Sequence, residues 1–293
     1  MKEVAINQKY KDSVFRMLFN NKKELLSLYN AVNGTTYENV DDLEINTLDD
    51  GVFMKMKNDI SFVLGFELNL YEHQSTKCGN IALRFLLYVS DLLSGMVVRD
   101  DLYKSKVIHI PAPRFIVFYN GHEITEDRVL YKLSDQYEKK LSAPELELTA
   151  TLININEDHN PELMNACRTL KDYSIFVGRI RKYAKTMILE EAVKSAVAEC
   201  IAEGILADFL SKNRAEVIRV SVLEYNEELH LKNVYQDGYD DCAAQKDAVI
   251  LEKDAAIAAK DAVIAEKDAA LTEMNARISE LEALLANLIN KDN

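Results

Sequence analysis

Two acidic side chains and an amide stand close together in the apolar, glycine-containing stretch NDISFVLGFELNLYEHQST, which begins at residue 58. If the apolar runs on either side of the glycine form neighbouring antiparallel strands, Asp59 lies across from the region of Glu72. The two-residue period of a strand then places Glu72 and Gln74 on one face and His73 on the other. Carboxylates that converge at the end of a strand suit a hard cation such as Mg²⁺, which assists phosphodiester cleavage. The stretch therefore predicts a metal site.

This spacing also has a plainer interpretation, and the surrounding sequence decides between the two. The chain has 48 Asp and Glu among 293 residues, so an Asp followed by Glu-x-Gln also suits the solvated face of a hairpin. Five segments in a distinctive order favour the metal site. They are YKDSVFRMLF at 10–19, LLSLYNAVNGT at 25–35, LYEHQST at 70–76, LRFLLY at 83–88 and PRFIVFYNG at 113–121.

Through these segments the chain closely resembles the recombination-promoting nuclease (Rpn) and transposase family, a branch of the PD-(D/E)XK nuclease superfamily, over about residues 10–228. The resemblance implies an α/β fold with a restriction-endonuclease-like mixed sheet flanked by helices. It also implies an acidic site on the second and third strands that holds one or two metal ions, and Asp59 and Glu72 match its carboxylates. The function that follows is metal-dependent cleavage of DNA in a recombination, mobile-element or defence context.

Further residues are candidates for the same site. The main-chain carbonyl of His73 would add a ligand for Mg²⁺, with Mn²⁺ as an alternative, and the side chain of Gln74 would orient the attacking water. Gln74 stands where the superfamily more often has Lys, so it brings no positive charge to a developing oxyanion. Lys57, two residues before Asp59, or Arg84 on the following helix could supply that charge.

Asp12 and Arg84 each have two interpretations. Asp12 either caps the first helix or adds a third acidic group to the metal site. Arg84 and Tyr88 lie one turn apart on a helix. Arg84 either forms a salt bridge with an acidic residue of the core or supports the phosphate or metal site, since a guanidinium suits contact with oxyanions.

The apolar periodicity places this site on a strand-rich region between two helices. We expect helices at 9–32, ended by Asn33-Gly34, and at 80–98, capped by Asn80. The strands before the second helix are expected to form a meander. The expected strands are 43–48, 52–56, 59–63, 68–72, 114–119 and 146–152.

The sequence beyond Pro161 contains no further proline and is predicted to be helical. Helices at 163–186, 187–211 and 214–233 are expected there. A seven-residue repeat then begins with KDAVILE at Lys246 and continues for six heptads. Three parts are therefore predicted: a nuclease-like domain at 1–160, a helical segment packed on it at 161–243, and a coiled coil at 244–293.

The repeat places apolar residues at position a and a mixture of Lys and apolar residues at position d. Facing Lys side chains at position d weaken a parallel dimer. The segment from Met274 to Leu288, whose d positions are apolar, is therefore expected to associate most strongly. We expect a homodimer, and an isolated charged helix is the alternative. Position a holds Ile250, Ile257, Ile264, Leu271, Ile278 and Leu285, and position d holds Lys253, Lys260, Lys267, Met274, Leu281 and Leu288.

Acidic residues are concentrated in the C-terminal third of the chain. Residues 190–293 hold 11 Lys and Arg against 22 Asp and Glu, which accounts for −11 of the net charge of −13. A protein that binds nucleic acid must neutralise phosphates. DNA contact is therefore expected in residues 1–189, where positive and negative charges nearly balance.

Other classes of protein are not indicated. No apolar run reaches the ~18 residues that a membrane span needs, and the N-terminus has no apolar signal core, so we expect a cytoplasmic protein without a membrane contact. The four cysteines lack zinc-like spacing and are expected to be reduced thiols. The resulting hypothesis is a Mg²⁺-dependent endodeoxyribonuclease. The alternative is a catalytically weak or inactive nuclease fold that serves as a regulatory or oligomerisation module.

Overall fold

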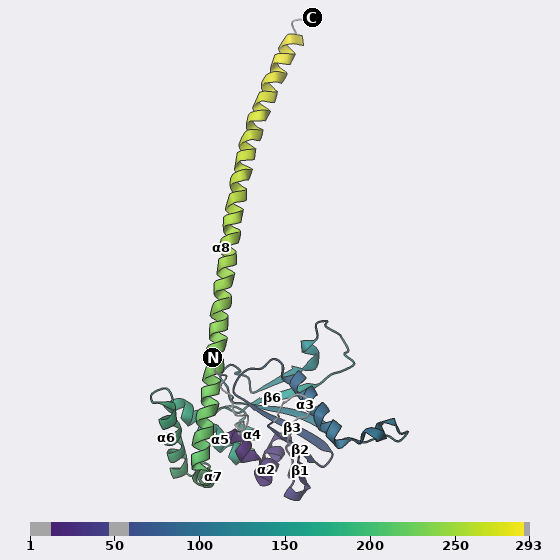
Figure 1. The fold of residues 1–293 in the computed structure, drawn as a ribbon, viewed down its shortest axis with the longest axis vertical. Coiled ribbons are helices and arrows are strands. Elements are labelled where there is room, and N and C mark those ends of the chain that lie inside the picture. The colour runs from purple at the N-terminus through teal and green to yellow at the C-terminus, as the bar shows by residue number, and fades with distance from the viewer. Residues whose placement is uncertain (1–12, 47–58, 290–293) are drawn as a thin grey trace, which may run out of the picture. The chain divides into compact units, whose positions relative to one another are not determined.

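Figure 1 shows the computed structural model of the chain, which describes residues 13–46 and 59–289. The chain divides into two compact units, of which the first extends to Glu228 and the second begins at Leu229. The first unit contains a β-sheet with helices packed on both of its faces. The described part of the second unit is helical throughout.

The strands of the described residues form one mixed sheet of six strands in the order β1-β2-β3-β4-β6-β5. The first three are antiparallel neighbours, β4 is parallel to β3 and β6, and β5 is antiparallel to β6. The predicted α/β class with a mixed sheet is therefore confirmed. The bounds are β1 Leu43–Ile45, β2 Ile60–Leu64, β3 Glu67–Gln74, β4 Ala112–Tyr119, β5 Arg128–Lys132 and β6 Thr149–Asn154.

The hairpin of β2 and β3 has the geometry that the sequence predicts. Ile60 pairs with Tyr71 and Leu64 with Glu67, which leaves a loop of two residues. The first loop residue, Gly65, has a φ of 60°. A positive φ at this position suits the twist of a tight hairpin, and glycine adopts it without steric cost.

The described helices precede, interrupt and follow the sheet. Their bounds are α1 Val14–Phe19, α2 Lys22–Asn33, α3 Ile81–Met96, α4 Pro161–Ala166, α5 Arg168–Tyr183, α6 Leu189–Ala202, α7 Ala207–Lys212 and α8 Arg214–Ile289, with short 3-10 helices η1 Val40–Asp42, η2 Arg99–Tyr103 and η3 Leu133–Gln136.

The single N-terminal helix predicted from the apolar period is wrong, because the chain breaks it in two. The side chain of Asn21 accepts hydrogen bonds from two main-chain N–H groups in the first turn of α2, which starts a new helix there. The cap of α1 is Ser13, whose hydroxyl accepts from the Arg16 N–H at 3.0 Å. Asp12 lies outside the described residues. Gly34, with a φ of 65°, ends α2 as predicted.

The strand expected at 52–56 lies outside the described residues. The strand predictions differ from the structure at β6 and at β5. The strand expected at 146–152 runs later in the chain, as β6. Apolar periodicity does not predict β5, a five-residue edge strand whose side chains are all exposed or half-buried and therefore leave a weak apolar pattern.

Side chains that alternate along the strands build a separate core on each face of the sheet. On one face, Leu68 and Leu70 of β3 pack with residues of α3. On the other face, Tyr71 belongs to a core that also contains residues of α1, α2, α4 to α7 and the start of α8 as far as Val220. The helices that follow Pro161 thus share a core with the sheet. The domain boundaries expected at residues 160 and 243 stay predictions.

Helix α8 is continuous through the seven-residue repeat, so the helical part of the coiled-coil prediction is confirmed. The position-a side chains from Ile250 to Ile278 are between 49% and 59% exposed on this single helix. They are therefore accessible to a partner helix, and the pairing itself stays a prediction. Within residues 13–46 and 59–289, no helix combines the length and the apolar character that crossing a bilayer requires.

Candidate metal centre

The carboxylates of Asp59 and Glu72 both lie at one end of the β2–β3 hairpin, where each accepts a hydrogen bond from the main chain across from it. The main-chain N–H of Asp59 donates to Glu72 Oε1 at 3.3 Å, and Asp59 Oδ2 accepts from the His73 N–H at 2.6 Å. Asp59 directly precedes β2, and the pairing of Ile60 with Tyr71 places it opposite Glu72. The register of the hairpin therefore brings together the two acidic side chains that the sequence singles out.

The side chains at the end of β3 point to opposite faces, as the sequence predicts. Glu72 and Gln74 share the face of Leu70, against which α3 packs. The ring of His73 lies on the other face, where it stacks on Phe15 of α1 with ring centres 4.9 Å apart and an angle of 15° between planes. The ring of His73 is thus turned away from the carboxylates.

The main-chain carbonyl of His73, in contrast, points to the side of β3 where Asp59 lies. The Gln74 carbonyl accepts from the Asn120 N–H at 3.0 Å, on the side of β4. The N–H and C=O of one strand residue point the same way, and neighbouring residues point in opposite directions. Because the His73 N–H donates to Asp59, its carbonyl points to the same side. This direction supports the predicted third oxygen ligand.

Arg84 of α3 pairs with the candidate ligand Glu72. Its Nη2 atom lies 2.9 Å from Glu72 Oε2, and its Nε and Nη2 atoms donate to the Tyr88 hydroxyl at 3.2 and 3.0 Å. Only 3% of Glu72 is exposed, so the guanidinium compensates a carboxylate that is almost fully removed from water. Both interpretations of Arg84 therefore meet in one contact: it forms a salt bridge, and its partner is a candidate metal ligand.

Local charges keep Arg84 and Tyr88 protonated. Burial lowers the pKa of Arg84. The negative charge of Glu72 and the hydrogen bond to Tyr88 together raise this pKa by more than burial lowers it, so the net shift is upward. Burial, followed by the charge of Glu72, raises the pKa of Tyr88. The site therefore contains a permanent positive charge beside one of its carboxylates.

The His73 ring is neutral at physiological pH. The surrounding side chains remove it from water, and together with the positive charge of Arg181 this lowers its pKa to about 3. Its Nε2 atom lies 3.0 Å from the hydroxyl of Tyr173. Since the His73 ring carries no charge and faces the other core, it does not supply the positive charge that Gln74 fails to bring to the site.

The structure places some of the predicted site residues close together, and two others lie outside the described residues. Contacts join Arg84 to Glu72, Glu72 to the main chain of Asp59, and the carboxylate of Asp59 to the main chain of His73. Gln74 is half-buried on the face of Glu72. The two remaining candidates, at positions 12 and 57, lie outside the described residues.

The oxygen atoms at this site suit Mg²⁺. Within the part of the chain that the structure describes, no three His, Cys, Asp or Glu side chains form a metal-binding group. Two carboxylates and a carbonyl are nevertheless a suitable set for Mg²⁺, which keeps several of its waters and is commonly held by one or two carboxylates. An all-oxygen set does not favour zinc, which prefers His and Cys in structural sites. The donor set therefore fits the predicted cofactor.

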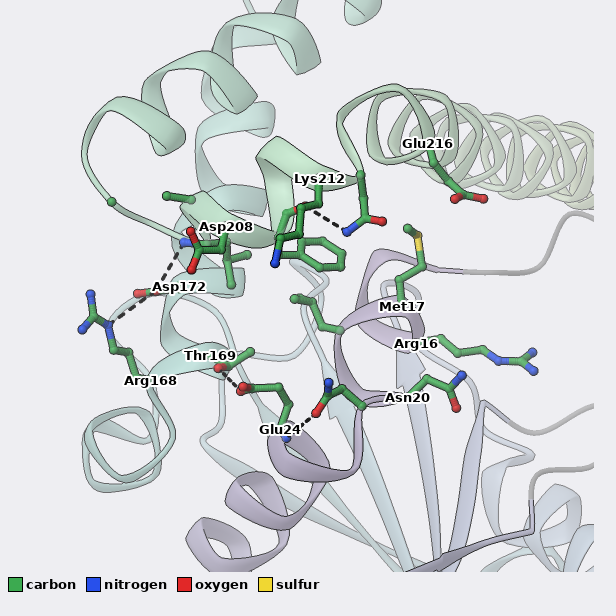
Figure 2. Close-up of a pocket in the computed structure, with 17 residues that line it drawn as sticks. Arg16, Met17, Asn20, Glu24, Arg168, Thr169, Asp172, Asp208, Lys212 and Glu216 are labelled. Atoms are coloured by element: carbon green, nitrogen blue, oxygen red, sulfur yellow. Dashed lines mark hydrogen bonds and ion pairs between the residues drawn. The ribbon is translucent and has the colours of Figure 1, made fainter. Parts of the chain in front are cut away.

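A separate cavity of about 970 Å³ lies among α1, α2, α5, α7 and the start of α8 (Figure 2). Side chains of both charges line it, including Arg16, Lys212, Asp208 and Glu216. These helices pack on the face of the sheet opposite α3. None of the described candidate residues lines this cavity, so it is not part of the metal centre.

The contact between Arg84 and Glu72 leads to a prediction about stability. Arg84→Met should lower the free energy of unfolding by about 2 kcal/mol, less than the ~3–5 kcal/mol for breaking a fully buried pair, because the Arg84 side chain is 32% exposed. Added Mg²⁺ should raise the melting temperature of this variant more than that of the wild type, because the cation replaces the lost positive charge beside Glu72.

Calorimetric melting with and without Mg²⁺ measures both effects. Arg114→Met is the matched control. Arg114 pairs at 3.1 Å with Glu67, which lies on the same strand as Glu72 but on the other face of the sheet. An equal Mg²⁺ effect on the wild type and on Arg84→Met would contradict the prediction.

Comparisons of the chain with models of protein families, with curated proteins and with solved structures find no match. The family resemblance therefore rests on the sequence segments quoted above.

Proposed function

We propose that this protein is a Mg²⁺-dependent endodeoxyribonuclease, with Asp59 and Glu72 as the carboxylates that hold the metal. The observation that carries the proposal is the position of both carboxylates at one end of the β2–β3 hairpin, each bonded to the main chain across from it, with the His73 carbonyl on the side of Asp59. Such a grouping of oxygen ligands is typical of sites that use a hard cation.

Each residue has a distinct part in the proposed reaction. A Mg²⁺ or Mn²⁺ ion held at this site supplies a Lewis acid for the activation of water and the stabilisation of charge on the phosphate. Asp59, Glu72 and the His73 carbonyl bind it, and the Gln74 amide orients the attacking water. Arg84 provides the positive charge that Gln74 lacks at its position, because its guanidinium lies on the same face and stays protonated.

The proposed substrate and assembly follow from the distribution of charge and from the repeat. DNA binds to the N-terminal part, since the strongly acidic residues 190–293 repel a polyanion. The heptads of α8 join two copies into a homodimer, which holds two active sites near one duplex. Two nicks on opposite strands then produce a double-strand break.

A second candidate function is supported by a specific contact. Arg84 already occupies Glu72 Oε2, and Gln74 takes the place of the lysine that is common in the superfamily. A cation must therefore share Glu72 with a guanidinium, which lowers its affinity. In this second reading the nuclease fold is inactive and the chain acts as a regulatory or oligomerisation module.

Cleavage of supercoiled plasmid by the purified full-length chain distinguishes the two functions. Nicked circles should accumulate with Mg²⁺ and with Mn²⁺ and should be absent with EDTA. Ca²⁺ serves as a comparison ion, because it accepts oxygen ligands at longer distances and in looser geometry. If no ion supports nicking, the inactive fold is the correct interpretation.

A further inference from the structure

The last residues of β3 are held from the face of the sheet that lies opposite the carboxylates. The His73 ring is stacked on Phe15, and its Nε2 atom lies 3.0 Å from the hydroxyl of Tyr173 in α5. The rings of His73 and Tyr173 meet edge to face at 5.6 Å between centres. The side chain of His73 is therefore anchored by two helices, while its main chain faces Asp59.

The next residue, Gln74, is held through the loop that follows β4. Its carbonyl accepts from the Asn120 N–H at 3.0 Å. The Asn120 carbonyl in turn accepts from Arg181, which also donates to Asn156 Oδ1 at 3.1 Å. The side-chain nitrogen of Asn120, Nδ2, lies 3.5 Å from the Tyr173 hydroxyl. The contacts of Gln74 and of His73 therefore both lead to helix α5.

These polar groups are buried where apolar side chains would pack at lower cost. Tyr173 is 1%, Asn120 5% and Arg181 9% exposed. Burial of polar atoms is unfavourable unless they are hydrogen-bonded, and a connected network then specifies one arrangement of the chain. The arrangement specified here is the position of the β3 end, from which the site presents a carbonyl and an amide.

We infer that Tyr173 and Arg181 of α5 are positioning residues for the metal centre: Tyr173 holds the His73 carbonyl in place through the His73 ring, and Arg181 holds Gln74 through Asn120. This inference rests on the proposed function, because it assigns these residues to the site that binds the cation. Neither side chain contacts the cation, the phosphate or the water. The helical segment after Pro161 is thus part of the active-site support rather than an appendage.

The test uses the full-length chain carrying Tyr173→Phe, which keeps the ring in its packing and removes only the hydroxyl. Mn²⁺ binding is measured by isothermal titration calorimetry, and nicking is measured across a series of Mg²⁺ concentrations. The Kd for Mn²⁺ and the Mg²⁺ concentration for half-maximal nicking should both rise about tenfold, the lower end of the cost of removing groups that orient metal ligands. The maximal rate at saturating Mg²⁺ should change by less than about twofold if only the binding of the cation is affected.

Tyr183→Phe is the matched control, because Tyr183 lies on the same helix and donates its hydroxyl hydrogen bond to Glu199, away from β3. This variant should bind Mn²⁺ as the wild type does. Arg181→Lys keeps the charge and tests the second connection, and it should also weaken Mn²⁺ binding. It serves as the independent variant if Tyr173→Phe does not fold.

Two outcomes overturn the inference while the proposed function stands. In the first, the wild type binds Mn²⁺ and nicks DNA, and both Tyr173→Phe and Arg181→Lys keep its affinity. In the second, Tyr183→Phe loses as much affinity as Tyr173→Phe, which shows a general loosening of α5. A wild-type chain that neither binds Mn²⁺ nor nicks DNA refutes the proposed function and the inference together.

Discussion

Replacing Asp59 by Asn, or Glu72 by Gln, is expected to reduce plasmid nicking below about 1% of the wild-type rate, a loss of at least ~2.7 kcal/mol of transition-state stabilisation. Each change removes one of the two negative charges at the end of the hairpin and leaves the volume of the side chain nearly unchanged. A site with two carboxylates cannot replace a lost one from another described side chain, since no larger group of metal-binding side chains is present among the described residues. Nicking is measured at saturating Mg²⁺.

The two variants need a control for folding, because Glu72 is buried against Arg84. Glu67→Gln is matched to Glu72→Gln: Glu67 is also on β3 and also pairs with an arginine, Arg114, at 3.1 Å, but it belongs to the other face. This control should keep its activity. Wild-type nicking by Asp59→Asn or Glu72→Gln, or an equal loss in Glu67→Gln with unchanged melting temperatures, would remove the site assignment.

Deletion of residues 246–293 is expected to convert the dimer into a weakly associated or monomeric protein and to reduce double-strand breaks at least about tenfold more than nicks. The carboxylates lie in the other unit, so each remaining copy keeps its site. A double-strand break needs two sites on one duplex, and dimerisation supplies the high local concentration of the second site. Light scattering measures the oligomeric state, and the ratio of linear to nicked plasmid measures the coupling.

Replacing Lys253, Lys260 and Lys267 by Leu should have the opposite effect and tighten association, because apolar side chains at position d are then buried in the seam. Both results together identify the repeat as the interface. If the truncated chain keeps the oligomeric state of the full-length chain, the dimer interface lies before Lys246, and the repeat serves as a spacer or as a docking helix for another partner.

Local sequence was sufficient to predict the hairpin and its carboxylates. Two apolar runs define the strands, and Gly65 allows the positive φ that a two-residue loop requires. Since the side-chain period of a strand is two, the register alone determines that Asp59 lies opposite Glu72 and that His73 faces away. The heptads likewise determine a long helix, because seven-residue spacing repeats without a break.

Local sequence predicted the structure less well where apolar periodicity and local polar contacts have similar strength. The apolar period runs through both N-terminal helices, but the first helix ends with its C-cap at Asn20 and the side chain of Asn21 begins the second. The edge strand β5 has little buried surface, so its pattern does not stand out from a loop. In both places a short polar contact or an edge position, rather than apolar periodicity, decides the structure.

Only the tertiary structure decided which side chains the candidate residues contact. The sequence left Arg84 with two roles, and the packing of α3 on the sheet selects Glu72 as its partner. His73 and Tyr173 are 100 residues apart, and no periodicity or motif connects them. Contacts of this kind arise when helices are packed on the two faces of the sheet, because the shape of each core, and not the spacing along the chain, determines which polar groups meet.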